Sequence, residues 1–277
     1  MSLSKQLIII GSMLFICNTS RGQDTAGHTV YRTFRISGQA AEYAALASQL
    51  ETMMQHAVDK KYKQLGGCVR NIFVPWIRDH VHVMKAMKYM EKDMTSFLEF
   101  YLEKQTAEGI YFDYYYPINS GGINDRMKLF DKRYWEVYPE DSIQMHRLPV
   151  EADLEYLMVE GVYAVWQSTG DTSFVRKWLP AIVKGIRYSM TDSLRWSSKF
   201  QLIKRGYTLD TWDFMQLPLP RKEYKERGGN IQQGIFNITR ETPMGIMHGD
   251  NSGLYAACLQ LSKMYSITGD TIASRKW

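Results

Sequence analysis

A ten-residue repeat constrains the fold of this chain more than any other feature of its sequence. Residues 169–178 read TGDTSFVRKW and residues 268–277 read TGDTIASRKW, so seven of ten positions are identical at an offset of 99 residues. Each copy follows one helical pattern and opens the next, with a glycine placed to end the first helix. The repeat therefore predicts a helical hairpin that recurs within a larger assembly.

Apolar residues at three- and four-residue spacing predict the helices of these hairpins. The predicted helices cover residues 41–63, 79–104, 151–168, 172–190 and 251–267. The stripe of Met87, Met90 and Met94 is typical of a packed core. Residues 105–150 and 191–250 keep no period, and the only strand expected is a short one near residues 30–36. The predicted fold class is therefore all-α.

The second copy of the repeat stops at Trp277, whereas the apolar pattern after the first copy continues through Leu179 and Ile182. Half of a hairpin cannot bury its apolar face. We therefore expect residues 23–277 to be the N-terminal part of a longer domain.

Residues 1–22 predict a secretory signal peptide. Lys5 precedes a short apolar stretch, and the small residues Ser20 and Gly22 stand before a cleavage point at Gln23. A lipid anchor at Cys17 is the weaker alternative, because bulky Ile16 precedes it. The apolar stretch is too short to span a bilayer comfortably. We expect an exported protein, periplasmic or extracellular, with no other membrane association.

Composition narrows the classes of partner. The chain is 45% hydrophobic and 23% charged, which excludes a disordered tail or a coiled coil. The net charge of +5 comes without any block rich in Lys or Arg, so we do not expect a nucleic-acid partner. His80 and His82 are two apart, so on a helix they point to different sides and do not predict a metal site. No cofactor is expected. Cys68 and Cys258 form either one disulfide or two buried thiols.

Two clusters of candidate binding residues precede the helices at 79–104 and 151–168. In the first, a guanidinium and a carboxylate can grip vicinal sugar hydroxyls while an aromatic ring stacks on the sugar; its residues are Trp76, Arg78 and Asp79. The alternative is a helix cap with a packed Trp. In the second, carboxylates gather at a helix start, which dipole complementarity can also explain; its residues are Arg147, Glu151 and Asp153.

Two further clusters lie later in the chain. Asp210 and Asp213 flank Trp212, and an aromatic wall raises the pKa of a neighbouring carboxyl, as a proton donor to a glycosidic oxygen requires. The alternative is a capping Asp and a core Trp. Asp250 lies in a polar turn before the helix at 251–267, where it either binds substrate or caps the helix. All four clusters lie at or just before a helix start. In a ring of hairpins these starts share one face, which predicts a single carbohydrate site.

These motifs resemble the six-hairpin glycosidase superfamily, the (α/α)6-barrel enzymes that include glucoamylases and trehalases. The segment WIRD, residues 76–79, is similar to the motif with which glucoamylase-like enzymes hold a terminal sugar, which implies Arg78 and Asp79 as substrate ligands. The segment DTWDF, residues 210–214, implies Asp213, or failing that Asp210, as the general acid. The resemblance implies an (α/α)6 toroid that is incomplete in this chain. It also implies an inverting mechanism whose base lies beyond Trp277.

The sequence leaves three functions open. The first is an exported glycoside hydrolase that acts on an oligo- or polysaccharide. The second is a glycan-binding protein without catalysis, or a truncated inactive relative. The third is a polysaccharide lyase, with a Tyr or His base and an Arg that neutralises a uronate.

Overall fold

The structure is a computed structural model that describes residues 44–46, 48–50, 52–53, 62–89, 91–118, 132–206, 238 and 244–277. The chain divides into two compact units, Met1–Lys60 with Tyr89–Lys92, and Lys61–Lys88 with Asp93–Trp277. In the first unit, residues 44–46, 48–50 and 52–53 are helical. The elements that carry the described candidate residues all belong to the second unit. The predicted signal peptide lies outside the described residues.

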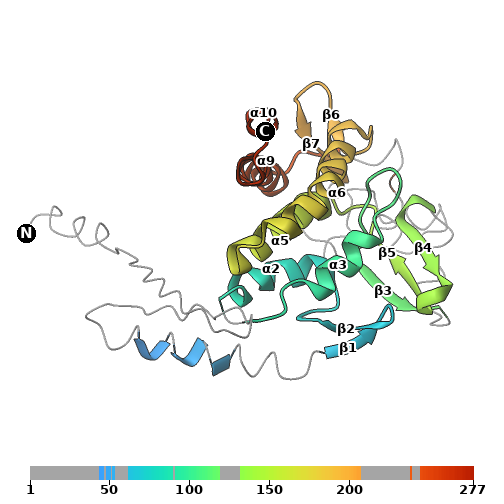
Figure 1. Cartoon of the computed structure of the whole chain (residues 1–277). Helices are drawn as coiled ribbons and strands as arrows, with labels where there is room; N and C mark the ends of the chain where they lie inside the picture. Colours follow the sequence, from blue (N-terminus) through green and yellow to red (C-terminus); the bar gives the residue numbers. More distant parts are fainter. Residues whose placement is uncertain are drawn as a thin grey trace, which may run out of the picture. The chain divides into compact units, whose positions relative to one another are not determined.

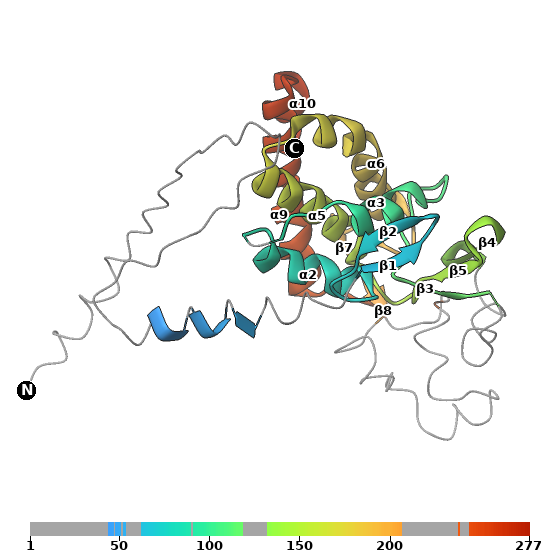
Figure 2. The ribbon, with the colours of Figure 1, turned by 60° about the horizontal axis from the view of Figure 1, so that its bottom comes forward.

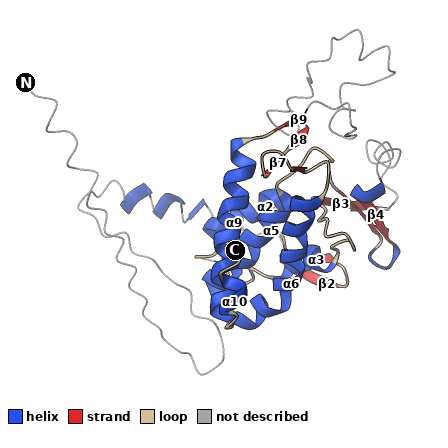
Figure 3. Ribbon diagram, turned by 90° about the horizontal axis from the view of Figure 1, so that it is seen from above, coloured by secondary structure: helices blue, strands red, loops and turns tan. Residues whose placement is uncertain are grey.

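A group of helices forms the centre of the second unit (Figure 1). They are α2 (Ile77–Met87), α3 (Ser96–Glu103), α5 (Leu154–Thr169), α6 (Thr172–Thr191), α9 (His248–Thr268) and α10 (Thr271–Ser274). Helix α5 packs against α2, α6 and α9, and lies between them in Figure 3. Because α5 is covered on several sides, its buried residues run around the helix, among them Leu157, Val159, Val162 and Val165. Among the described helices, none has both the length and the apolar character that crossing a membrane requires.

The repeat has a structural role at two helix-to-helix turns. Gly170 ends α5 and Gly269 ends α9, with φ of 72° and 94°, a left-handed conformation that glycine adopts without strain. The next residue then caps the following helix: Asp171 accepts from two backbone N–H groups of α6, and Asp270 accepts from the N–H of Ala273. The predicted helical hairpin of α5 and α6 is confirmed.

Short strands flank the helices. All pairs are antiparallel, and the sheets are β1 (Tyr62–Leu65) with β2 (Cys68–Asn71), β3 (Tyr114–Pro117) with β5 (Ile143–His146) and β4 (Trp135–Tyr138), β6 (Trp196–Ser197) with β7 (Leu202–Ile203), and β8 (Arg205–Gly206) with β9 (Met244–Gly245). The 3₁₀ helices η2 (Lys132–Tyr134) and η3 (Pro139–Asp141) adjoin β4. In Figures 1 and 2 the three-stranded sheet lies on the side of the helices away from α9.

The prediction of an all-α fold, an (α/α)6 toroid incomplete in this chain, is wrong. The second unit combines helices with antiparallel sheets, three strands of which come from the 105–150 segment that was expected to be a loop. The strands there are four residues long, and β5 is buried on both faces, so no alternating pattern marks them. The helix expected over residues 79–104 is also divided into α2 and α3. The expected core role of the Met stripe is confirmed for Met87 and Met94, which are buried.

Candidate functional site

Three helix starts from distant parts of the chain bring polar side chains together. Arg78 lies in the first turn of α2, Asp153 is the N-cap residue of α5, and Asp250 lies in the first turn of α9. Helices α2 and α9 both pack against α5. The N-terminal end of a helix carries a partial positive charge, which favours carboxylates there. The structure therefore gathers Arg78, Glu151, Asp153 and Asp250, as their shared placement before helices predicts.

Arg78 connects the first two carboxylates. Its Nε lies 2.8 Å from Oδ2 of Asp153, and its Nη1 lies 3.9 Å from Oε1 of Glu151. The Arg78 side chain is 25% exposed, while those of Glu151 and Asp153 are nearly buried. Oε2 of Glu151 also accepts from the backbone N–H of Leu148 at 3.2 Å. One guanidinium thus serves two carboxylates while part of its surface remains accessible.

Asp113, which no sequence motif indicated, completes this part of the site. Trp76, the N-cap residue of α2, offers no side-chain cap. Instead, the Asp113 carbonyl accepts from the N–H of Ile77 at 2.7 Å, and its Oδ1 accepts from the N–H of Arg78 at 3.1 Å. These bonds satisfy donors that the start of a helix leaves open. The available signal was a single Asp among aromatic residues in the sequence YFDYYY, residues 111–116.

A second ion pair lies beside the first. Nε of Arg205, on β8, lies 3.3 Å from Oδ2 of Asp250, and both side chains are nearly buried. The pairing of β8 with β9 positions Arg205 there, because β9 leads directly into α9. Burial raises the pKa of Asp250, opposed by Arg205 and reinforced by Asp153. Arg205 is the first residue of the sequence cluster that contains Asp210 and Asp213, but no spacing rule linked it to Asp250.

The site also contains a buried acceptor without a donor. Oδ2 of Asp153 faces Arg78, but Oδ1 is buried and has no hydrogen-bond partner among the described residues. Buried polar atoms in proteins are nearly always paired, so this oxygen is available to accept a hydrogen bond from a donor that the described residues do not supply. A sugar hydroxyl can donate to this oxygen and accept from a guanidinium N–H. The arrangement is therefore suited to binding a polyhydroxylated molecule.

The Asp113 carboxyl predicts a pH dependence of stability. Burial raises its pKa from the ordinary 3.8 to about 7, although the Arg78 backbone and guanidinium favour the ionised form. The folded protein keeps this proton where the unfolded chain has lost it. The resulting stabilisation is complete below about pH 4 and is lost as the pH rises through about 7. We expect Asp113→Asn, which keeps the acceptor oxygen, to gain roughly 2–3 kcal/mol relative to wild type between about pH 5 and pH 8.

Urea unfolding of both proteins across this pH range measures the difference. Asp141→Asn is a suitable control, because that carboxylate pairs with Lys104 away from the three helix starts. A gap between wild type and Asp113→Asn that stays constant with pH would contradict the prediction.

The remaining predicted residues are placed differently. Trp76 is 37% exposed and Asp79 is exposed in the first turn of α2, beside the cluster. Arg147 is fully buried and pairs with Glu155, so its guanidinium has no surface with which to contact a substrate. Asp210, Trp212 and Asp213 lie outside the described residues, and their roles stay predictions.

No group of three or more His, Cys, Asp or Glu side chains in the described ranges is arranged to hold a metal ion. Comparison of the chain with protein-family models, with curated proteins and with solved structures finds no match.

Proposed function

We propose that this chain is an exported carbohydrate-active protein, a glycoside hydrolase whose sugar-binding site is formed by Arg78, Glu151, Asp153 and Asp250. The observation that carries the proposal is the buried Oδ1 of Asp153 beside the Arg78 guanidinium, an oxygen that has no hydrogen-bond donor in the described part of the chain. Together they offer a donor and an acceptor to neighbouring hydroxyls of one sugar. Asp250 and Arg205 repeat the pairing of a carboxylate with a guanidinium.

The proposed reaction is hydrolysis with inversion at the anomeric carbon. A carboxylic acid protonates the leaving oxygen while a second carboxylate activates water, and such pairs lie about 6.5–9.5 Å apart in inverting enzymes. Asp213, or failing that Asp210, is the proposed acid. Arg78 and Asp153 would hold hydroxyls of the sugar next to the cleaved bond. Trp76, exposed at the start of α2, would stack on a sugar ring.

The charges favour a neutral sugar over a uronate. A lyase needs a cation that neutralises the substrate's carboxylate. Arg78 is already ion-paired with Asp153, and Arg205 with Asp250. Bringing a uronate to either guanidinium would place it next to a protein carboxylate, and like charges at short range repel. The hydrolase is therefore preferred to the lyase.

The test replaces the guanidinium that holds the sugar. We expect Arg78→Met to weaken binding of neutral oligosaccharides at least about tenfold, equivalent to 1.4 kcal/mol, in titration calorimetry. Arg78→Lys keeps the charge but loses the fork-shaped donor set, so its affinity should fall between those of wild type and Arg78→Met. Lys85→Met is the matched control, because Lys85 lies on the same helix and pairs with Glu160 at 3.1 Å.

A panel of neutral gluco- and manno-oligosaccharides serves as the probe, with uronate-containing oligosaccharides beside it. Release of reducing sugar, with the inverted anomer seen first by NMR, supports hydrolysis. Binding without product identifies the non-catalytic alternative. Unsaturated product from the uronates alone would establish the lyase, and Arg78→Met binding as tightly as Lys85→Met would overturn the assignment of the site.

A further inference from the structure

The segment that carries Glu151 and Asp153 has little regular structure of its own. Residues Leu148 to Asp153 form neither helix nor strand, and Pro149 has no backbone N–H to donate. The N–H of Glu151 donates to the Leu148 carbonyl at 3.0 Å, which closes one turn. Glu151 and Asp153 of the proposed site therefore lie on an irregular segment that contacts from outside the segment must hold in place.

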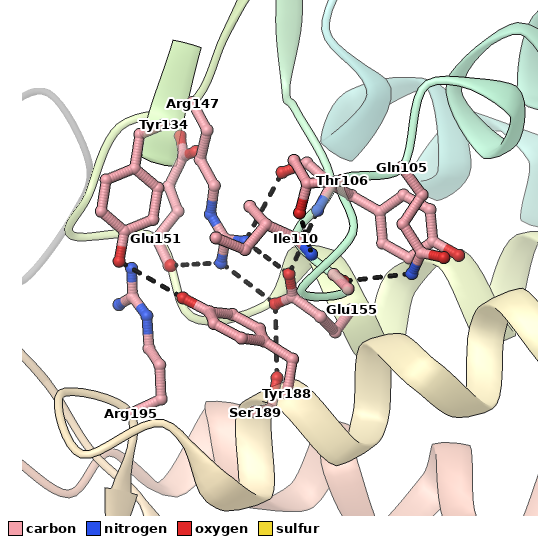
Figure 4. A network of polar contacts seen from close by, with 12 residues as sticks. Gln105, Thr106, Ile110, Tyr134, Arg147, Glu151, Glu155, Tyr188, Ser189 and Arg195 are labelled. Carbon is pink, nitrogen blue, oxygen red and sulfur yellow. Dashed lines mark hydrogen bonds and ion pairs between the residues drawn. The ribbon is translucent and has the colours of Figure 1, made fainter. Parts of the chain in front are cut away.

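Two buried arginines bind three successive carbonyls of this segment. Arg195 donates to the carbonyl oxygens of Pro149 and Val150, and Nη2 of Arg147 donates to that of Glu151 at 2.6 Å. Arg147 and Arg195 are at most 1% exposed. A guanidinium presents several donors in a fixed plane, so it fixes the direction of the carbonyls that it binds. Figure 4 shows Arg147 reaching Glu151 and Glu155 together.

Buried charge makes this arrangement difficult to open. Glu155 accepts from Nη1 and Nη2 of Arg147, the second at 3.0 Å, and from the Ser189 hydroxyl at 3.3 Å. Arg147 and Arg195 lie over the same ring, with their guanidinium carbons 5.9 and 5.7 Å from the centroid of Tyr134. The carbonyl oxygens supply acceptors that these buried cations need. Moving residues 149–151 away would leave buried guanidinium N–H groups without acceptors. The arginines therefore hold the segment in place, and the segment's carbonyls stabilise the buried arginines.

We propose that Arg147 and Arg195 are positioning residues, which bind the carbonyls of residues 149–151 and thereby hold Glu151 and Asp153 against Arg78. The two arginines come from elements on either side of the segment: Arg147 follows β5, and Arg195 follows α6. The α5–α6 hairpin is thereby linked to the geometry of the three helix starts. The inference rests on the proposed function only in taking Glu151 and Asp153 as sugar ligands.

Amide hydrogen exchange in the absence of any sugar tests the positioning directly. The N–H groups of Leu148 and Glu151 both close the segment on itself. In Arg195→Met we expect their exchange to accelerate at least tenfold, while amides in the middle of α5 and α6 keep their rates. Arg195→Lys, which keeps the charge without the fork, should give a smaller increase and serves if the Met variant does not fold. Arg133→Met is the matched control, since Arg133 lies over the same Tyr134 ring but pairs with Asp192.

Unchanged exchange at 148–153 would overturn the proposal, and so would an equal acceleration throughout α5 and α6, because that indicates general destabilisation. If the protein hydrolyses an oligosaccharide, Arg195→Met should also lower kcat/KM for that substrate at least tenfold, and Arg133→Met should not. If no oligosaccharide is cleaved, the exchange result still decides the positioning role. If cleavage occurs and exchange at 148–153 is unaffected, only the positioning role is lost.

Discussion

Replacing Asp213 by Asn is expected to lower kcat for oligosaccharide hydrolysis by about 10²–10⁴-fold, the usual contribution of a general acid. The amide has the size of the carboxyl but no proton that it can transfer to the leaving oxygen. Asp210→Asn is the matched comparison, three residues away on the other side of Trp212. A loss confined to Asp210→Asn would move the acid role to Asp210.

The leaving group separates the acid role from a structural one. The leaving group of an activated aryl glycoside departs with little need of a proton. Asp213→Asn should therefore cleave such a substrate at a rate much closer to wild type than its rate on an unactivated oligosaccharide. A residue that only maintains the fold would affect both substrates alike. Equal losses on both, or wild-type rates from both Asn variants on the oligosaccharide, would remove this pair of residues from the proposed mechanism.

Local signals explain which elements were predictable. The expected helices at 151–168, 172–190 and 251–267 correspond to Leu154–Thr169, Thr172–Thr191 and His248–Thr268. In the first and last of these, glycine at the end and aspartate at the next start act within a few residues, so sequence alone reveals them. The β1–β2 hairpin was equally local: Gly66 and Gly67, with φ of 59° and 69°, form its two-residue turn. The helix predicted over residues 41–63 overlaps the start of β1, so the hairpin was not predicted.

Non-local contacts explain what the sequence could not supply. Arg78 and Asp153 could be brought together in prediction because both precede helices. Asp113 joins them through bonds to a helix that starts 36 residues earlier, and Arg205 reaches Asp250 through a strand pair two residues long. Arg147 shows the limit most clearly. An arginine close in sequence to Glu151 and Asp153 suits a sugar site, and only the fold determines that it pairs with Glu155 in the interior.

Glu155→Gln is expected to lower the free energy of unfolding by about 3–5 kcal/mol, because it leaves the Arg147 guanidinium buried without its counter-ion. The replacement preserves side-chain volume, so no cavity contributes to the loss. The stability of a folded domain is about 5–15 kcal/mol, so urea unfolding will resolve a change of this size. Lys177→Met is the control, because it breaks the Lys177–Glu99 pair, whose lysine side chain is 56% exposed, and should cost less than about 1 kcal/mol.

The double variant Arg147→Met/Glu155→Leu shows what the arginine does besides balancing charge. Apolar replacement of a whole buried ion pair is often neutral or stabilising, because the desolvation cost of both ions disappears. Here Arg147 also donates to the carbonyl of Glu151, which the double variant leaves without that donor. We therefore expect the double variant to be more stable than Glu155→Gln and close to wild type in stability. Its amides at residues 148–153 should nevertheless exchange faster than in wild type, as expected for Arg195→Met. Wild-type stability together with wild-type exchange rates in the double variant would show that Arg147 and Glu155 form only a structural ion pair. A loss of less than about 1 kcal/mol in Glu155→Gln would contradict the buried, unscreened character of the pair.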